Sequence, residues 1–256
     1  MRCKQTVLFN WPFYAVAGVV TALAPFVVRR LPATLWVRLP AYAGFALVAM
    51  WLVTSLAASW IVYDRSRLME WDWMLQALGF PPKSWINVHA GHDDSSDALR
   101  RLFGTATGRV FDIFSPEEMT EASIERARLR SLRERRRSRP ADADTLAAEH
   151  ADYRHLPLPN GAVDVATLLL SAHELRSEEA RGALFAELRR VLGPAGRVVV
   201  VEHLRNWANF LAYGPGFLHF HSRRTWLRCF ARHRFDVHRE FSITPFVRIF
   251  VLRRLT

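Results

Sequence analysis

Side chains that can move protons follow two apolar stretches near the middle of this 256-residue chain. His173 and Glu174 come shortly after the apolar run 163–170, and His203 comes shortly after the run 198–201. Histidine and glutamate serve as general acids and bases because their surroundings can bring their pKa values close to neutral pH. We therefore predict that His173 and Glu174 are catalytic, with His203 as the next candidate for a base. The alternative for any single histidine is a buried residue whose hydrogen bonds are satisfied inside the fold.

The elements that would position these side chains form one unit of an α/β fold. The run 163–170 is apolar on both faces apart from Asp164 and Thr167, as in a strand buried within a parallel sheet, and 198–201 indicates a second such strand. Between them, residues 178–192 place alanine and leucine on one stripe with charged residues opposite, which predicts an amphipathic helix that Gly193 and Pro194 end. Ligands of such strand–helix–strand units bind at the carboxyl ends of the strands, where the candidate acids and bases lie.

Two long uncharged stretches occupy the first quarter of the chain. No charged residue occurs between positions 4 and 29 or between positions 38 and 64. Each stretch exceeds the roughly 20 apolar residues that a membrane-spanning helix needs, so we predict spans at about 9–28 and 39–63. Residues that are tolerated best near the ends of a span stand near these ends: Trp11, Pro12, Pro25, Trp36, Pro40, Trp60 and Tyr63.

Two alternatives exist for these stretches. A signal peptide needs a short hydrophobic core followed by a small-residue cleavage site, and none occurs before Arg29. A pair of core helices in a soluble domain needs a polar face, which neither stretch offers. Two spans place both chain ends on the same side of the membrane. The basic residues do not decide which side, because some flank the spans and others lie between them: Arg2, Lys4, Arg65 and Arg67 against Arg29, Arg30 and Arg38.

The net charge of +11 is concentrated in one segment of the remaining chain. Residues 126–139 contain eight arginines and one glutamate. A solvated helix face is the simplest interpretation of this segment. Contact with anionic lipids is the second, because a basic residue beside a membrane surface contributes about 1 kcal/mol to binding. Nucleic-acid binding is the third, and the absence of interleaved aromatic side chains argues against it. Two cysteines, Cys3 and Cys229, form neither a disulfide framework nor a metal motif.

The rest of the chain alternates between strand and helix patterns. Further strands are expected at 85–91, 109–114, 235–241 and 246–252, the last two as an antiparallel hairpin. Further helices are expected at 63–78, 98–103, from Ser115 into the arginine-rich segment, near 146–150 and at 222–233, with loops at 140–145 and 206–216. The predicted organisation is a transmembrane hairpin at 1–63, a linker helix at 64–84 and an α/β domain at 85–256.

Several acids and one longer motif are arranged as in a known family. The acids stand at the end of the second expected strand, before Leu156-Pro-Leu-Pro159 and at the start of the strand 163–170: Asp112, Asp152 and Asp164. The stretch Glu187-Leu-Arg-Arg-Val-Leu-Gly-Pro-Ala-Gly196 then leads into the next strand. Over roughly 85–252 these features resemble the class I S-adenosylmethionine-dependent methyltransferases of type 11. The resemblance implies an α/β, Rossmann-like sheet with a C-terminal antiparallel hairpin, which the two-helix transmembrane hairpin precedes here.

The resemblance implies S-adenosylmethionine as the cofactor and assigns residues to bind it. Asp112 would accept hydrogen bonds from both ribose hydroxyls. Asp152 would accept from the adenine amino group, with Tyr153 beside it. The turn after the first strand, at 91–95, would approach the methionine part of the cofactor.

That turn departs from the pattern of the family. Gly91 stands at the second of three expected glycines, His89 and Asp93 stand at the other two, and Asn87 replaces the expected aspartate. Side chains at these positions narrow the space in which backbone would meet the ligand. The polar stretch 92–96 could instead supply side chains that hold the amino-acid end of the cofactor. We therefore include His89, Gly91 and Asp93 among the predicted cofactor-binding residues.

The predicted function is transfer of a methyl group from S-adenosylmethionine to a small or lipophilic acceptor. The cofactor is cytosolic, so the domain would lie at the cytoplasmic face of a membrane that the chain crosses twice, with the lipid bilayer and the acceptor as its partners. The alternative is a catalytically inactive methyltransferase-like membrane scaffold or binding module. The incomplete glycine turn favours this alternative, whereas the paired acids Asp112 and Asp152 favour the enzyme. The oligomeric state and the methylated atom are not predicted.

Two further histidines belong to the predicted mouth of the substrate site. His219 and His221, two residues apart, would face the same side of a strand and line this mouth with Phe217 and Phe220. Two histidines could hold a metal ion, but a third ligand does not lie nearby in the sequence. The sequence therefore predicts no metal site.

Overall fold

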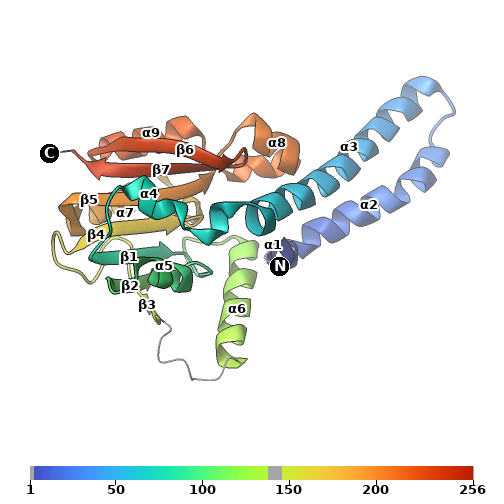
Figure 1. Ribbon diagram of the computed structural model, residues 1–256. Helices are drawn as coiled ribbons and strands as arrows, with labels where there is room; N and C mark the ends of the chain where they lie inside the picture. The colour runs from blue at the N-terminus through green and yellow to red at the C-terminus, as the bar shows by residue number, and fades with distance from the viewer. Residues whose placement is uncertain (1–2, 138–145, 256) are drawn as a thin grey trace.

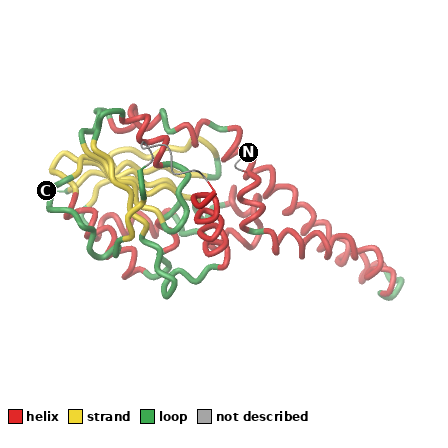
Figure 2. The backbone as a smooth tube through the Cα atoms, turned by 90° about the horizontal axis from the view of Figure 1, so that it is seen from below, coloured by secondary structure: helices red, strands yellow, loops and turns green. Residues whose placement is uncertain are grey.

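The computed structural model describes residues 3–137 and 146–255 and contains one seven-stranded mixed sheet (Figures 1 and 2). Its order is β3-β2-β1-β4-β5-β7-β6. The strands are β1 (Ser84–His89), β2 (Thr107–Asp112), β3 (Ala148–His150), β4 (Val163–Leu169), β5 (Leu192–His203), β6 (Phe235–Thr244) and β7 (Val247–Arg254). Strand β7 runs antiparallel to both neighbours, and the other paired strands are parallel. The C-terminal hairpin predicted from the sequence is confirmed.

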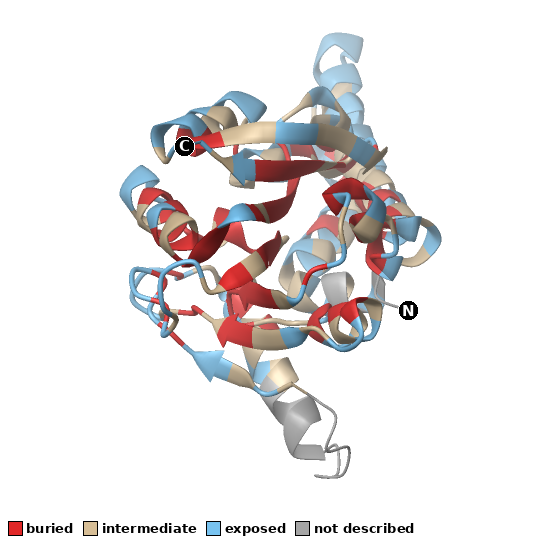
Figure 3. Ribbon diagram, turned by 60° about the vertical axis from the view of Figure 1, so that its left-hand side comes forward, coloured by how far each residue is buried: buried red, intermediate tan, exposed pale blue. Residues whose placement is uncertain are grey.

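The centre of the sheet is buried on both faces, which is why its strands are apolar throughout (Figure 3). Val198 and Val200 of β5 pack into one apolar cluster, and Val199 and Val201 pack into another. Helices α7 (Glu178–Val191) and α9 (Arg223–Arg232) contribute to the first cluster. The second contains residues of α4 (Trp73–Leu78) and α5 (Ser96–Phe103). Alternate side chains of one strand thus hold the two helical layers to the sheet.

Four predicted segments differ in the structure. The short helix expected near 146–150 is the edge strand β3, where Glu149 pairs with Arg109 of β2 (Arg109 Nε to Glu149 Oε1, 2.9 Å). The loop expected at 206–216 contains helix α8 (Trp207–Tyr213) followed by the 3₁₀ helix η4 (Gly214–His219). Asn206 begins α8, because its side-chain oxygen accepts a hydrogen bond from the Asn209 N–H at 2.9 Å.

The linker helix expected at 63–78 is broken into three short pieces. These are the π helix η1 (Ile61–Arg65), the 3₁₀ helix η2 (Arg67–Glu70) and α4. Trp71 lies between the last two with φ at 61°, so its left-handed backbone interrupts the helix while its ring stays buried. Similarly, the helix expected from Ser115 begins later, as α6 (Ala122–Arg137). The loop expected at 140–145 lies outside the described residues.

The N-terminal helices form a hairpin that projects away from the sheet (Figure 1). After α1 (Cys3–Phe9), helices α2 (Trp11–Arg30) and α3 (Leu35–Trp60) are long and apolar enough to cross a membrane by length and composition. Little of either helix is buried, and many of its large apolar side chains are exposed, which does not fit core helices. The C-terminal part of α3 packs on α8, where the rings of Trp51 and Phe210 lie 5.8 Å apart. The hairpin is therefore joined to the α/β domain by direct contacts.

Candidate functional site

A cavity of about 480 Å³ lies at the carboxyl ends of β1, β4 and β5. The strands and the segments that follow them contribute Ala90, Leu169, Ser171, His173, Glu174 and His203. The N-terminal helices contribute Phe9, Phe13, Tyr14 and Ser55, and the start of α6 contributes Ile124 and Ala127. The sequence predicted a site at these strand ends, but it did not predict that the apolar hairpin would form part of the wall.

His173 is held in this cavity by two carboxylates. Its Nδ1 donates to Glu202 Oε2 at 2.6 Å, its backbone N–H donates to Glu202 Oε1 at 3.2 Å, and its Nε2 lies 3.3 Å from Glu174 Oε1. Burial lowers the pKa of His173, but the charges of Glu202 and Glu174 outweigh burial and raise the pKa to about 10. His173 thus carries a proton at neutral pH in this arrangement and stabilises negative charge rather than accepting a proton.

Glu174 and His203 complete the ionisable lining of this part of the cavity. Burial raises the pKa of Glu174, but its hydrogen bond and charge interaction with His173 outweigh burial and keep the pKa below its usual value. Burial, assisted by the charge of His173, lowers the pKa of His203 to about 4. His203 is therefore neutral: its Nδ1 donates to the Phe246 carbonyl at 3.0 Å, and its Nε2 accepts from the Tyr63 hydroxyl at 3.2 Å.

Asp112 lies at the end of β2, where the resemblance placed the ribose-binding acid. Its Oδ1 accepts from the backbone N–H groups of Gly91 and Phe114 at 2.8 and 3.1 Å. Its Oδ2 accepts from Arg128 Nη1 of α6 at 2.8 Å. The Arg128 guanidinium also lies over the Phe114 ring, 4.4 Å from its centroid. One arginine of the basic segment therefore binds the candidate cofactor acid instead of facing solvent.

Side chains shape the turn that replaces the glycine-rich loop. Asp93 Oδ1 accepts from the backbone N–H groups of Ser95 and Ser96 at 3.1 and 3.0 Å and so holds the first turn of α5. Asn87 Nδ2 donates to Ser96 Oγ at 2.8 Å. His89 is buried, with its Nδ1 3.9 Å from Asp112 Oδ1. His89 therefore lies beside Asp112, Asn87 and Asp93 hold the start of α5, and the neighbouring residues Ala90, His92 and Asp94 line the cavity.

Asp152 and Tyr153 follow the edge strand β3 and do not line the cavity. The Ala151 N–H donates to the Asp112 carbonyl at 3.1 Å, so the segment after β3 begins beside the end of β2. The Asp152 side chain is about half exposed, at 55%, and its Oδ1 accepts from the Arg154 N–H at 2.9 Å. Tyr153 is buried and donates to Glu118 Oε2 at 2.6 Å; burial and this hydrogen bond raise the pKa of Tyr153 to about 12.

Glu187 of the longer motif and Asp164 at the start of β4 hold backbone segments in place. Glu187 Oε1 accepts from the Leu156 N–H at 2.7 Å, and Glu187 Oε2 accepts from Arg190 Nε at 2.8 Å. Arg190 then donates to the Leu158 carbonyl at 2.7 Å. Asp164 Oδ2 accepts from the Lys83 N–H at 2.8 Å, which joins the starts of β4 and β1. The motif therefore fixes the loop after Tyr153, and Asp164 fixes the start of β4 relative to β1.

The two histidines assigned to one strand face separate environments. The segment before Phe220 is the 3₁₀ helix η4, so the alternation of a strand does not apply. His219 and Phe220 line the cavity, whereas His221 is buried against Arg181, whose Nη1 lies 3.0 Å from His221 Nε2. Burial, then the charge of Arg181, lowers the pKa of His221 to about 3. His219 instead lies beside His173 and Glu174, which the spacing along the chain gave no signal to predict.

Parts of this chain are similar in sequence to known proteins. Residues 102–200 match the model of a family described as methyltransferase domain. A ubiquinone/menaquinone biosynthesis C-methyltransferase, UbiE, of Ralstonia nicotianae is 31% identical over 142 residues, which are 55% of this chain and 51% of the relative. The corresponding protein of Ralstonia pickettii is 38% identical over 133 residues, which are 52% and 48% of the two chains. The chain thus spans about half the length of these curated relatives.

Solved structures share the fold. The S-adenosylmethionine-dependent methyltransferase of Aquifex aeolicus superposes with a TM-score of 0.53 at 16% identity and covers 74% of this chain and 93% of its own. The pyocyanin biosynthetic protein PhzM has a TM-score of 0.51 at 18% identity and covers 78% of this chain and 58% of its own. These structures share the Rossmann-like fold of methyltransferases, and the match to the methyltransferase domain model points to the same cofactor, S-adenosylmethionine.

The described residues fit this cofactor in their chemistry. Asp112 offers a carboxylate that two backbone N–H groups hold in place, as a pair of ribose hydroxyls requires. Ala90, one residue before Gly91, lines the cavity, so the cavity reaches the turn beside which the methionine part would lie. Its volume is within the roughly 300–1,000 Å³ of small-molecule sites. Arg128 is the residue that must share Oδ2 of Asp112 with the ribose or move away from it.

Proposed function

We propose that this protein is a membrane-tethered methyltransferase that transfers a methyl group from S-adenosylmethionine to a small lipophilic acceptor. One observation carries the proposal: the cavity that contains His173 is walled in part by Phe13 and Tyr14 of α2 and Ser55 of α3. An acceptor dissolved in the bilayer could therefore pass along the apolar hairpin to the strand ends without crossing water. The names of the curated relatives make quinone-related molecules the first acceptors to test.

The residues of the cavity would position the acceptor and exclude water. When bound, S-adenosylmethionine supplies a methyl group that is already activated, so catalysis depends chiefly on orientation and on a suitable charge near the acceptor. Protonated His173 would stabilise a negative oxygen on the acceptor, and Glu174 would hold that imidazolium in place. Neutral His203 stacks on Phe220 with ring centroids 4.8 Å apart and would form an apolar wall for a flat acceptor.

Titration of the full-length protein with S-adenosylhomocysteine, in detergent or in lipid nanodiscs, tests this function. We expect calorimetry to give saturable binding, followed by transfer of labelled methyl groups from S-adenosylmethionine to quinone-related acceptors. Absence of binding at millimolar ligand would contradict the enzyme. It would favour a second candidate, an inactive methyltransferase-like membrane module. Arg128 on Asp112 and the side chains in the glycine turn are the observations that favour this candidate.

The tether rests on the exposed apolar surface of α2 and α3. Side chains that water would not favour are exposed along both helices: Trp11, Phe13, Val16, Val19, Leu23, Phe26, Leu39, Leu47, Met50 and Val53. We propose that these helices span the membrane at about 9–28 and 39–63, with the α/β domain at 85–256 on the cytoplasmic side. Segment 64–84 would link the two parts. The cytosolic origin of the cofactor supports this orientation.

Arginine at position 47 should weaken membrane insertion. Leu47 lies near the middle of α3 and is 41% exposed, so Leu47→Arg would place a charge in the hydrocarbon core. This substitution should disfavour insertion by about 3–4 kcal/mol, because arginine is unfavourable and leucine favourable at the centre of a span. The fraction of the protein that alkaline carbonate removes from membranes should rise accordingly. Ala231→Arg, at an exposed position of α9, is the matched control and should leave this fraction unchanged. Equal extraction of both variants would show that α3 does not span the bilayer.

A further inference from the structure

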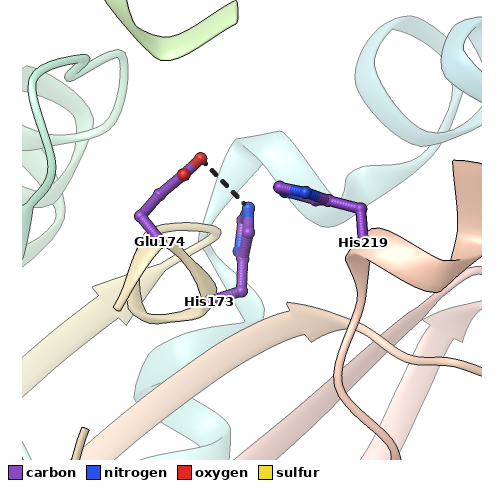
Figure 4. A group of neighbouring side chains, drawn as sticks. All are labelled: His173, Glu174 and His219. Carbon is purple, nitrogen blue, oxygen red and sulfur yellow. Dashed lines mark ion pairs between the residues drawn. The ribbon is translucent and has the colours of Figure 1, made fainter. Parts of the chain in front are cut away.

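Three side chains from two separate segments converge beside the cavity (Figure 4). His173 and Glu174 lie on the 3₁₀ helix η3 (Ala172–Glu174) after β4, and His219 ends η4. One ligand atom from each residue lies within 4.8 Å of the others. We propose that His173, Glu174 and His219 bind a divalent transition-metal ion, with Zn²⁺ as the ion that this ligand set suits best. Two imidazoles and one carboxylate are the ligands of many catalytic zinc sites.

The distance between the first two ligands fits a shared ion. His173 Nε2 and Glu174 Oε1 lie 3.3 Å apart. Two ligand atoms that are each about 2.0–2.2 Å from Zn²⁺ at a tetrahedral angle lie about 3.3–3.6 Å apart. His219 approaches from the opposite side, with its ring centroid 5.2 Å from that of His173 and the two rings nearly perpendicular (Figure 4). A small movement of the His219 side chain would bring its nitrogen to coordination distance.

Both histidines have a carboxylate on the ring nitrogen that would not bind the metal. Glu202, which is fully buried, accepts from His173 Nδ1 at 2.6 Å and leaves Nε2 facing Glu174, so a bound ion would replace the Nε2 proton that His173 carries without it. Glu121 Oε1 lies 3.5 Å from His219 Nδ1 and so leaves Nε2 of that ring as the ligand atom. Carboxylates in this position fix the orientation of metal-binding histidines and raise their basicity. Both histidines therefore have the outer carboxylate partner that is typical of metal-binding histidines.

The ion pair between His173 and Glu174 uses only one of the two oxygens of the Glu174 carboxylate. Glu174 Oε2 is buried and has no hydrogen-bond partner among the described residues. A buried carboxylate oxygen without a partner is unfavourable, and a bound cation would remove this penalty.

Arg176 fixes the backbone that carries the two histidines. Its Nη1 donates to the His219 carbonyl at 2.6 Å and to the His173 carbonyl at 3.3 Å. A single guanidinium thus joins η3 to η4, although these segments are far apart in the chain. The positions of the proposed ligands are therefore determined by the fold and not only by the side chains.

The site also suggests which acceptors the enzyme takes, a point that rests on the proposed function. Three protein ligands leave a fourth position of a tetrahedral ion open, and all three line the cavity. A phenol or enol oxygen of the acceptor could occupy that position. Binding to the ion would lower the pKa of such a hydroxyl, so that its proton would pass to solvent and leave a negative oxygen. The inferred acceptors are therefore lipophilic molecules with an ionisable hydroxyl group.

Metal titration of the full-length protein tests the site. The protein is purified in detergent, freed of any histidine tag and of metal, and titrated with Co²⁺, which gives a visible absorption band in four- or five-coordinate sites. Zn²⁺ should then displace it at one equivalent. Glu174→Gln keeps the shape of the side chain, and His219→Ala removes a partly exposed ring, so both variants should fold. Each should reduce Zn²⁺ affinity by more than the 10–100-fold that loss of an outer partner brings.

The controls separate this site from other metal binding and from the methyltransferase itself. His238→Ala removes an exposed histidine of β6 and should leave the affinity unchanged. Absence of Co²⁺ binding, or binding that both ligand variants retain, overturns the proposal. Titration with S-adenosylhomocysteine under the same conditions reports on the cofactor separately. Cofactor binding without metal binding would refute only the metal site, and metal binding without cofactor binding would refute only the methyltransferase.

Discussion

Replacing Asp112 with alanine should reduce the affinity for S-adenosylhomocysteine by about 100-fold or more. Two hydrogen bonds from ribose hydroxyls to a charged carboxylate contribute roughly 1.5–3 kcal/mol each, and each 1.4 kcal/mol is a factor of ten in affinity. The backbone N–H groups of Gly91 and Phe114 would also lose their acceptor, so the turn beside the ligand would become less ordered. Calorimetric titration of the wild type and of Asp112→Ala measures the difference.

A second variant, Arg128→Ala, tests whether the arginine that binds Asp112 competes with the cofactor. Arg128 donates to Oδ2 of Asp112, the oxygen that a ribose hydroxyl would share. If the guanidinium competes with the cofactor, its removal should increase affinity, whereas Asp112→Ala should decrease it. Asp97→Ala changes an acid in the first turn of α5 and should leave affinity unchanged. Unchanged affinity in Asp112→Ala would show that the cofactor binds elsewhere.

Glu202→Gln should destabilise the α/β domain by about 3 kcal/mol or more. The Glu202 carboxylate is fully buried and binds both the ring and the backbone of His173. An amide of the same shape cannot balance the charge of the imidazolium, and breaking a buried ion pair from one side typically costs about 3–5 kcal/mol. The melting temperature of the full-length protein should therefore fall by about 6–12 °C. Thermal unfolding followed by circular dichroism, in detergent and with a chelator present, measures this shift.

A surface carboxylate provides the comparison for this variant. Glu178 pairs with Arg232, and more than half of each side chain is exposed. Glu178→Gln should therefore change stability by less than about 1 kcal/mol, because exposed ion pairs contribute little. A melting temperature that is the same in Glu202→Gln and Glu178→Gln would show that His173 is not charged in the folded protein.

The buried strands and the C-terminal hairpin were predictable from the sequence because burial on both faces leaves a local signal. Apart from Asp164 and Thr167, the short runs 163–170 and 198–201 contain no polar residue, as expected for strands at the centre of a sheet. The edge strand β3 has no such signal. It pairs with one neighbouring strand only, so burial imposes no apolar pattern on it. The same residue types therefore fit a short helix as well as a strand.

Part of the candidate site was predictable for a similar reason. His173 and Glu174 follow directly after a strand, and parallel strands bring their ends to one edge of the sheet. Glu202 could have been given a role from the sequence, because an acid at the end of a buried strand needs a charged partner. Its partner, however, is a residue of the neighbouring strand end, and only pairing of β4 with β5 identifies it.

The sequence by itself determined which segments are buried, which are apolar enough for a membrane, and which acids stand at strand ends. These properties depend on the type and periodicity of neighbouring residues, so they can be read locally. Only the tertiary structure decided that Arg128 binds Asp112, that His219 meets His173, and that the N-terminal helices wall the cavity. Each of these contacts joins segments that are distant in the chain. These contacts depend on how α6, η4 and α2 pack against the sheet, and a local sequence pattern does not predict that packing.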